Sequence, residues 1–298
     1  MVYTTKYKKN HSSAFSATNV QLRILTGSDA ESANKASHIY VGVNDVAKLI
    51  KQMYVGVNGK AKRVANAWVG VNGVARKIWP CVILKDLPAG SVVQIDETGD
   101  GTLVDYIVVA QNHYLNSTNT KEHTVFMRKN LLNATTKYGD NTYGESYIGE
   151  SLDTYVNNSW RASLSDKLFP ILMKITIPCN KWTSPYTSSA ERQIWVPSKD
   201  EIDPSYIKNE GPCFEYFTTR TTNADRIART TDGTARNWWT RSCVEGMGQD
   251  GAYVRIITSS GSGSNYTQTQ SHYCRPVFCL PSDLPVSPIS STTYDLVL

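Results

Sequence analysis

The chain has 298 residues, of which 40% are hydrophobic and 19% are charged, and its formal net charge is +5. This length and composition exclude a chain that is disordered throughout and suit one large or two modest folded domains. Residues 1–80 hold 12 Lys and Arg against 3 Asp and Glu, a net charge of +9, whereas the remainder sums to −4. A basic N-terminal region is compatible with binding to nucleic acid or to an anionic surface. Because it contains no run of basic residues, we interpret it as a solvated face and expect no nucleic-acid partner.

The first residues lead into no apolar core of a secretion signal, and no stretch approaches the roughly 18 apolar residues of a membrane span. We therefore expect synthesis in a cytoplasm and no membrane insertion. The six cysteines show no C-x-x-C spacing, so reduced thiols, several of them buried, are expected. They are Cys81, Cys179, Cys213, Cys243, Cys274 and Cys279.

Residues 1–36 are polar with few large apolar side chains, and we interpret them as an attachment arm that becomes ordered on docking. Residues 37–80 contain a threefold repeat of period 14, with the sequences YVGVNDVAK, YVGVNGKAK and WVGVNGVAR starting at Tyr40, Tyr54 and Trp68. Each copy places Asn-Gly or Asn-Asp between two β-prone runs. Asn-Gly favours a two-residue hairpin turn because both of its residues adopt positive φ.

The repeat therefore predicts three linked hairpins that form a meander. Such hairpins bury little surface alone, so we expect this segment to pack in an oligomer or against a larger assembly. The alternative is a small β-domain that packs against the rest of its own chain.

Residues 81–298 are predicted to form a single mixed domain, and short strands with a few helices indicate an α+β fold. Alternating β-prone residues predict strands at 91–96 and 103–110. Between them, the sequence DETGDG at residues 96–101 imitates the start of a calcium loop. The twelfth position, where such a loop needs an acidic ligand, is Ile107. We therefore predict a hairpin turn there.

Three further local patterns place elements in this domain. Ser151 is expected to cap a helix whose apolar side chains recur at helical spacing as far as Trp160. The sequence SKDE at residues 198–201 has the spacing of a capping box and predicts a helix start. Alternation further along the chain predicts a strand with Tyr253 and Arg255 on one side.

Signatures of catalysis are sparse. The chain has no G-x-S-x-G elbow, phosphate loop or dinucleotide fingerprint, and its histidines form no pair at metal-ligand spacing. Two alternatives are Cys243 and Cys274 as nucleophiles with His272 as base, and Glu245 with Asp250 as paired carboxylates. Nothing local supports the cysteines, for which burial is commoner, and the sequence does not give the separation of the two carboxylates. We therefore expect no enzymatic activity, no metal and no cofactor.

The most informative stretch runs from residue 238 to about residue 276. It opens with WWTRS and closes with Arg-Pro, while its interior is rich in Tyr, Ser, Gly and Asn. Those residue types build adaptable binding surfaces, and residues 259–271 supply almost none of the large apolar side chains that a core needs. We therefore predict a recognition surface held by a rigid frame. The frame residues are Trp238, Trp239, Arg241, Arg275 and Pro276.

On these residues the chain resembles C-type-lectin-like proteins encoded by phages and prophages of Gram-positive gut bacteria, several of which are target proteins of diversity-generating retroelements. The resemblance covers about residues 82–284. It rests on LPAGS at 87–91, YIVVA at 106–110, the helix at 155–160, WVPSKDEI at 195–202, WWTRS at 238–242 and RPVF at 275–278. The hairpin repeat is similarly reminiscent of phage tail proteins.

The resemblance implies a C-type-lectin-like domain, preceded by the N-terminal β-hairpin repeat segment, that displays a variable region at about 238–276. The calcium motifs of sugar-binding animal lectins, Glu-Pro-Asn and Trp-Asn-Asp, are missing, so calcium-dependent sugar binding is not implied. The ligand-binding positions that the resemblance implies are Val244, Glu245, Met247, Gln249, Asp250, Tyr253, Arg255, Ile257, Ser264, Asn265, Tyr266, Thr267, Gln268, Gln270, His272 and Tyr273.

The function expected from this resemblance is that of a receptor-binding protein at the tip of a phage tail, located in the virion. The N-terminal region would bind other tail proteins and form a homotrimer, and the variable region would bind a receptor on the bacterial host surface, either glycan or protein. Weak sites multiplied over a trimer would give tight adsorption through avidity. One alternative is a structural virion or injection-machine component. Another is an enzyme that modifies a host-envelope polymer, suggested by fold similarity to the formylglycine-generating family. That family uses paired cysteines, and no such pairing is evident in this sequence.

Overall fold

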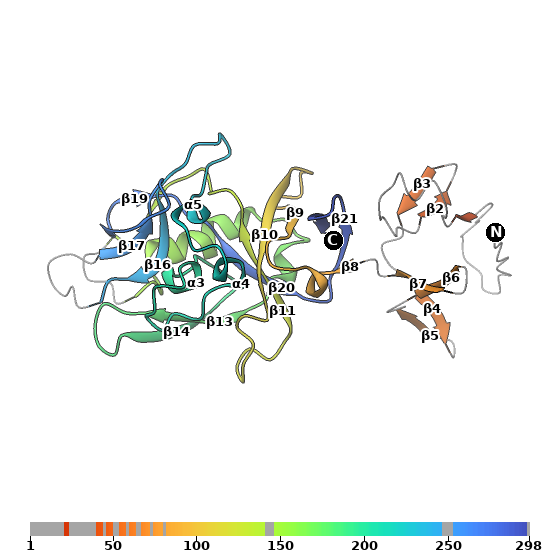
Figure 1. Cartoon of the computed structure of the whole chain (residues 1–298), viewed down its shortest axis with the longest axis horizontal. Coiled ribbons are helices and arrows are strands. Elements are labelled where there is room, and N and C mark those ends of the chain that lie inside the picture. The colour runs from red at the N-terminus through yellow and green to blue at the C-terminus, as the bar shows by residue number, and fades with distance from the viewer. Residues whose placement is uncertain are drawn as a thin grey trace.

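The structure, a computed structural model, describes residues 82–140, 146–245 and 253–296, together with strands β1 to β7 between residues 21 and 79 (Figure 1). In this part of the chain strands dominate, and the helices are few and short. The predicted mixture of strands and helices is therefore confirmed at the level of composition.

The N-terminal strands follow the 14-residue repeat. They are β1 (Gln21–Arg23), β2 (Tyr40–Val43), β3 (Val46–Leu49), β4 (Tyr54–Val57), β5 (Lys60–Arg63), β6 (Ala67–Val71) and β7 (Val74–Trp79). β2 pairs with β3, β4 with β5 and β6 with β7, each antiparallel, and β1 pairs with β2. The three pairs belong to separate sheets, so these strands do not form the continuous meander that the repeat predicts. The turns between paired strands and most of the expected arm lie outside the described residues.

An eight-stranded sheet forms the centre of the C-terminal domain, in the order β15-β20-β11-β10-β9-β22-β21-β8 (Figure 1). Its strands are β8 (Val82–Ile83), β9 (Val92–Asp96), β10 (Leu103–Gln111), β11 (His123–Arg128), β15 (Ile194–Trp195), β20 (Val277–Pro281), β21 (Pro285–Pro288) and β22 (Thr293–Leu296). Neighbours are antiparallel except β9 and β22, which are parallel. The first strand of the domain, β8, lies at one edge of the sheet, where it pairs with β21, and β21 pairs in turn with the last strand, β22.

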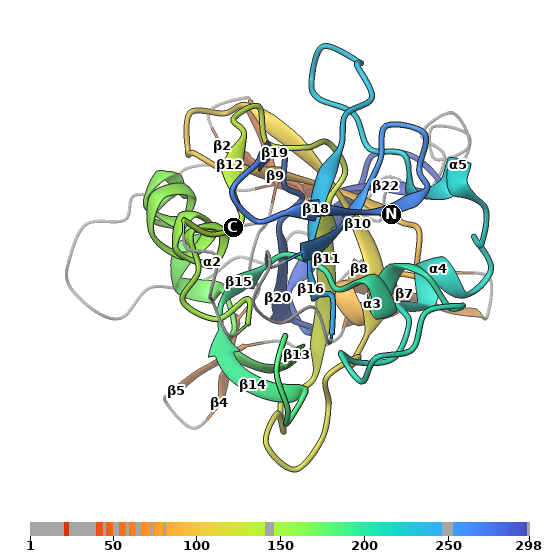
Figure 2. The same ribbon diagram turned by 90° about the vertical axis from the view of Figure 1, so that its left-hand side faces the viewer.

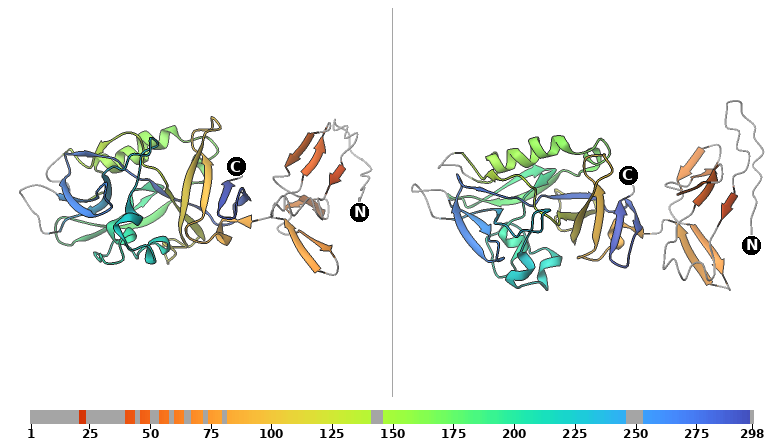
Figure 3. Two further views of the ribbon diagram at one scale, coloured as in Figure 1. Left: turned by 45° about the horizontal axis from the view of Figure 1, so that its top comes forward. Right: turned by 90° about the horizontal axis from the view of Figure 1, so that it is seen from above.

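Short helices cover both sides of this sheet. Figures 2 and 3 show α2 with the continuing η2 on one side and α3, α4 and α5 on the other. Their bounds are η1 (Leu84–Asp86), α2 (Ser151–Thr154), η2 (Tyr155–Trp160), η3 (Arg161–Ser163), η4 (Phe169–Ile171), α3 (Lys199–Ile202), α4 (Glu215–Thr218) and α5 (Asn223–Arg226). Because both faces are covered, every residue of the inner strand β11 is buried.

Local patterns account for the ends of several elements. The strands β9 and β10 are joined by a turn in which the Asp96 carboxylate accepts hydrogen bonds from the backbone N–H of Gly99, at 2.7 Å, and of Gly101, at 3.1 Å. This confirms the predicted hairpin turn. The capping box is also confirmed, since the Ser198 hydroxyl accepts from the Glu201 N–H and the Glu201 carboxylate accepts from the Ser198 N–H.

The helix expected near Ser151 is present, but Ser151 is its first helical residue and Glu150 occupies the N-cap position. The prediction of a serine cap is therefore wrong by one residue. The apolar face was correctly identified, because Leu152 and Val156 are 0% exposed and Trp160 is 8% exposed.

Aromatic rings join the inner strands of the sheet. Phe126 and Phe278 lie opposite each other on β11 and β20, with ring centroids 5.8 Å apart, and the ring of Tyr106 lies 4.9 Å from that of Phe278. All three side chains are 0% exposed. Phe278 therefore contributes to the packing of three neighbouring strands.

We predict that Phe278→Ala lowers the free energy of unfolding by about 3–5 kcal/mol, because it removes a buried ring and leaves a cavity. Leu103→Ala, at a side chain that is 48% exposed on β10, should change it by less than about 0.5 kcal/mol. Urea denaturation followed by tryptophan fluorescence measures both. Equal effects of the two substitutions would contradict the assignment of Phe278 to the core.

Candidate functional site

A small sheet carries most of the predicted recognition segment. It consists of β16 (Trp238–Cys243), β17 (Tyr253–Ile257) and β18 (Gly263–Thr267), in that order. The pairing of β16 with β17 is irregular, since Trp239 pairs with Ile256 but the next pair is Cys243 with Val254. The extra residues of β16 form a bulge, and bulges redirect side chains.

The bulge directs Arg241 into the interior, where it meets Glu201 at the start of α3. Both side chains are 0% exposed, and the two guanidinium–carboxylate distances are 2.6 Å from Nη1 and 2.7 Å from Nη2. The remaining N–H groups of Arg241 donate to the backbone carbonyls of Pro178, Val196 and Glu210. The pair therefore joins β16 at one buried point to α3 and to the backbone at Pro178, Val196 and Glu210.

The other frame residues are buried as well. The indole N–H of Trp238 donates to the Arg226 carbonyl at 3.3 Å, and that of Trp239 donates to the Thr136 carbonyl at 2.8 Å. Arg275 is 4% exposed and donates through Nε to the Arg128 carbonyl at 2.7 Å. Burial lowers the pKa of Arg275 to about 10, so it stays charged at neutral pH. Its neighbour Pro276 is buried, and the Pro276 carbonyl accepts from the Arg128 N–H at 3.0 Å.

One side of the small sheet presents a set of polar and aromatic side chains that we call the tyrosine–arginine face: Tyr206, Lys208, Tyr253, Arg255 and Asn265. Arg255 donates to the Asn265 side-chain oxygen at 2.5 Å and to the Tyr206 hydroxyl at 3.2 Å. The guanidinium carbon of Arg255 also lies 5.3 Å from the centroid of the Tyr206 ring. Lys208 forms an ion pair with Glu245 at 2.8 Å, and these side chains are 41% and 21% exposed. The strand β17 alternates as predicted, since Tyr253 and Arg255 are partly exposed whereas Val254 and Ile256 are 0% exposed.

Other candidate side chains lie on the opposite side of the same sheet. Tyr266 pairs with Val254, and its ring is 4.8 Å from that of His272, which lies 4.7 Å from the ring of Trp239. Burial lowers the pKa of His272, so its imidazole is uncharged at neutral pH. The predicted positions are therefore divided between two faces and do not form one continuous surface.

Three predicted contact residues are corrected by the structure. Ile257 is 0% exposed, Gln268 is 1% exposed and Val244 is 7% exposed, so their side chains are not available to a ligand. Met247, Gln249 and Asp250 lie outside the described residues. The remaining positions are exposed at Asn265 and Gln270 and half-buried at Glu245, Tyr253, Arg255, Ser264, Tyr266, Thr267, His272 and Tyr273.

The turn between β17 and β18 is held in place by its own hydrogen bonds. The Thr258 hydroxyl contacts those of Ser260 and Ser262, at 2.9 and 2.8 Å, and the Ser259 N–H donates to the Asn237 side chain at 2.8 Å. Gly261 has φ +83°, and a Cβ there would lie 1.7 Å from the Asn223 carbonyl oxygen. This serine-rich turn is therefore fixed against α5, although its composition resembles that of an adaptable loop.

The catalytic alternatives find no geometric support among the described residues. Cys243 and Cys274 are both 0% exposed. Burial raises the pKa of Cys274 to about 12 and that of Cys243 well above its ordinary value, so both thiols are protonated at neutral pH. A protonated, buried thiol is a poor nucleophile. Glu245 has Lys208 as its partner, and Asp250 is outside the described residues.

Sequence reasoning missed Tyr206 and Lys208, which belong to the tyrosine–arginine face but lie about 50 residues before β17 in the chain. The capping box located α3, and Tyr206 follows that helix by four residues. No local pattern indicated that this loop meets β17. The contact arises because the Arg241–Glu201 pair brings β16 against α3.

A family model matches residues 121–282, more than half of the chain. The chain belongs to the family described as domain of unknown function DUF6273. The comparison with curated proteins found no match, and neither did the comparison with solved structures. The DUF6273 match includes the frame and the tyrosine–arginine face, but not β8, β9, β10, β21 and β22 of the central sheet. The folded unit is therefore larger than the DUF6273 match.

Within the described ranges, no group of three or more His, Cys, Asp and Glu side chains has the arrangement of a metal site. No helix in this part of the chain is long and apolar enough to cross a membrane. The five cysteines that the structure describes are free, with four buried and Cys213 half-buried.

We predict that Arg241→Met lowers the free energy of unfolding by about 3–5 kcal/mol, because it leaves the Glu201 carboxylate buried without its partner. Arg255→Met is the matched control, since the polar contacts of Arg255 are partly exposed, and it should cost less than about 1 kcal/mol. Urea denaturation of both variants measures the difference. A cost of Arg241→Met as small as that of the control would show that the pair is not what holds the frame.

Glu210 generates a prediction about pH. Its side chain is 0% exposed, and this burial raises the pKa of the Glu210 carboxyl from the ordinary 4.5 to about 7. The nearby charge of Arg241 lowers this pKa, whereas that of Asp200 raises it. Because the pKa is raised in the folded state, the contribution of Glu210 to the free energy of unfolding is full below pH 4.5 and is lost as the pH rises through 7.

Glu210→Gln keeps an uncharged side chain at every pH. Relative to this variant, the native protein should lose stability between pH 4.5 and 7 by on the order of 1 kcal/mol per pH unit. Urea denaturation over this range measures the two curves. Parallel curves for the two proteins would contradict the raised pKa of Glu210.

Proposed function

We propose that the chain is a receptor-binding protein of a phage tail, with a C-type-lectin-like domain that binds a molecule on the surface of a bacterial host. The observation that carries this proposal is the tyrosine–arginine face, where an aromatic and cationic surface is mounted on a buried frame. Tyr and Arg are the residue types that most often dominate binding energy at protein interfaces. Three of its residues, Tyr253, Arg255 and Asn265, lie in the segment that resembles the variable region of diversity-generating-retroelement targets.

The proposed fold has two sources of support. The sequences WVPSKDEI and WWTRS, on which the resemblance rests, lie at the buried Arg241–Glu201 junction, as expected of a constant scaffold. The first strand of the domain, β8, also lies beside its last two strands, β21 and β22, at one edge of the sheet, so the intervening segment is presented away from β8. Such an arrangement suits a display domain at the end of a longer assembly.

Binding by this face would use preorganised groups. Arg255 is already oriented by Tyr206 and Asn265, so little side-chain entropy is lost when a ligand contacts it. Lys208 adds a second cation, partly neutralised by Glu245. The face therefore suits a receptor with hydroxyl, carboxylate or carbonyl groups, which are present in both glycans and proteins.

The N-terminal repeat is proposed to attach the chain to other tail proteins and to form a homotrimer. Its basic charge and its small sheets of two or three strands suit packing against a larger assembly. Three copies of one face would raise the strength of adsorption through avidity.

The test measures binding of labelled full-length protein to a panel of Gram-positive gut bacteria. We expect strain-selective binding that the double variant Tyr253→Ala, Arg255→Ala loses by at least tenfold, because it removes the centre of the face. The control variant Tyr294→Ala, Arg229→Ala removes the same residue types elsewhere on the domain and should bind as the native protein does. Thermal unfolding of each variant verifies that it is folded.

Equal binding by both variants would place recognition elsewhere on the chain. Absence of binding to every strain would contradict the receptor-binding proposal and favour a structural component of the virion. Light scattering on the same preparations gives the oligomeric state, and a monomer at micromolar concentration would contradict the trimer.

A further inference from the structure

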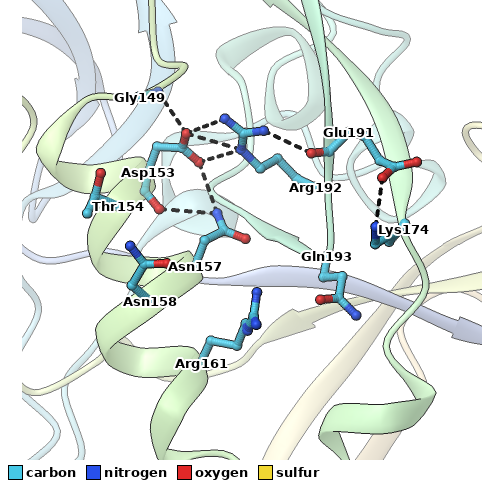
Figure 4. Close-up of a pocket in the computed structure, with 10 residues that line it drawn as sticks. All are labelled: Gly149, Asp153, Thr154, Asn157, Asn158, Arg161, Lys174, Glu191, Arg192 and Gln193. Atoms are coloured by element: carbon cyan, nitrogen blue, oxygen red, sulfur yellow. Dashed lines mark hydrogen bonds and ion pairs between the residues drawn. The ribbon is translucent and has the colours of Figure 1, made fainter.

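A second polar surface lies away from the tyrosine–arginine face. A pocket of about 390 Å³ opens between the helix formed by α2 and η2 and the strand β14 (Thr187–Arg192). Figure 4 shows side chains from the helix on one side and from the strand on the other. Its volume is within the range of about 300–1,000 Å³ that is typical of ligand sites, but such sites are mostly apolar. Every side chain that lines this one is polar or charged, apart from a glycine.

One wall of the pocket is rigid. Arg192 donates to the Asp153 carboxylate through Nε at 2.9 Å and through Nη2 at 2.7 Å, and the Gly149 N–H donates to the same carboxylate at 2.8 Å. Asn157 donates to Asp153 at 2.9 Å and to the Ile194 carbonyl at 2.8 Å. Asp153 is 3% exposed, so this wall is a buried network that presents its edge to the pocket.

Among the described residues, one of the three cationic side chains in the pocket has no acidic partner. Arg192 is compensated by Asp153, and Lys174 by Glu191 at 3.2 Å. Arg161 has no acidic partner among the described residues; its guanidinium carbon lies 4.6 Å from the centroid of the Phe169 ring. Stacking on the ring leaves the N–H edge of the guanidinium free for a ligand. In Figure 4 this group extends between Asn157 and Gln193.

Uncharged hydrogen-bonding groups surround Arg161. Asn157 and Gln193 use their amide N–H groups on backbone carbonyls or Asp153, and within the described part of the chain their side-chain oxygens receive no hydrogen bond. The Thr154 hydroxyl and the Asn158 amide are also without partners among the described residues, and both are exposed. The pocket therefore offers both donors and acceptors around one cation.

The backbone that positions these groups is unusual. The helix is π-helical over η2, which includes Asn157 and Asn158, and Arg161 follows directly after it. π-Helical turns are rare and occur frequently at functional sites. This second observation is independent of the charges and points to the same place.

We propose that this pocket is a binding site for an acidic saccharide, a compound with several hydroxyl groups and one carboxylate or phosphate. The anion would bind the fork of Arg161, and hydroxyl groups, which both donate and accept, would bind the amides and the Thr154 hydroxyl. An apolar ligand is excluded by the lining. None of the residues that line this pocket belongs to the tyrosine–arginine face, so the site is independent of the proposed receptor-binding surface.

The test titrates glucuronate, glucose 6-phosphate and glucose into the full-length protein and detects binding by ligand-observed NMR. We expect glucuronate, glucose 6-phosphate or both to bind at least tenfold more tightly than glucose. Arg161→Gln should weaken that binding at least tenfold, and Asn158→Ala should weaken it several-fold. Arg220→Gln is the matched control, because Arg220 also stacks on an aromatic ring, that of Tyr216 at 4.2 Å, outside the pocket.

Binding of glucuronate alone identifies the anion as a carboxylate, binding of glucose 6-phosphate alone identifies it as a phosphate, and either supports the proposal. Lack of binding by both acidic sugars at millimolar concentration would overturn it. So would equal affinity for glucose, or an effect of Arg220→Gln as large as that of Arg161→Gln. Thermal unfolding distinguishes a lost contact from a lost fold, and Asn158→Ala, at an exposed side chain, provides a second readout if Arg161→Gln does not fold.

Discussion

The buried pair of Arg241 and Glu201 is the interaction on which the rest of the domain depends. Moving two charges out of water costs several kcal/mol for each ion, and the cost is offset only when the geometry is good and the other donors are satisfied. That condition is met, because every N–H of Arg241 has an acceptor and Glu201 also accepts from the Tyr114 hydroxyl and the Ser198 N–H. One strong junction therefore fixes α3, β16 and the ends of β13 (Ile175–Asn180) and β15 relative to each other.

Further hydrogen bonds near the Arg241–Glu201 pair hold the small sheet from the interior of the domain. Cys243, at the end of β16, exchanges two hydrogen bonds with the Asn180 side chain, at 2.7 and 2.8 Å, so β13 is joined to β16 there. The Trp182 indole donates to the Tyr253 carbonyl at 2.8 Å and continues this connection to β17. Tyr253 and Arg255 thus both lie on β17, whose backbone is held from the interior, which is the arrangement that preorganised binding requires. The pocket between the α2–η2 helix and β14 is likewise held by an ion pair, here between Asp153 and Arg192.

Short-range patterns were reliable guides to this fold. The turn at Asp96, the capping box at Ser198 and the alternation of β17 each depend on residues within a few positions of one another, and each was identified from the sequence. The errors arose where a distant segment decides the outcome. Ile257 lies in a segment of mostly polar residues, but it pairs with Trp238 of β16 and is 0% exposed. Gln268 is polar and near two tyrosines, yet it is 1% exposed, and its carbonyl accepts from the N–H groups of Tyr138 and Gly139.

The sequence by itself determined the mixed composition of strands and helices, the positions of several turns and caps, and the two ends of the recognition segment, because these follow from local propensity and period. Only the tertiary structure decided which side of β17 faces solvent, that Tyr206 and Lys208 join that face, and that Arg161, in a polar pocket, has no acidic partner among the residues that the structure describes. The physical reason is that the exposure of a side chain and the compensation of its charge depend on which distant segment packs against it. A bulge of a few residues in β16 and one buried ion pair bring those segments together, and neither leaves a signature in the spacing of residues along the chain.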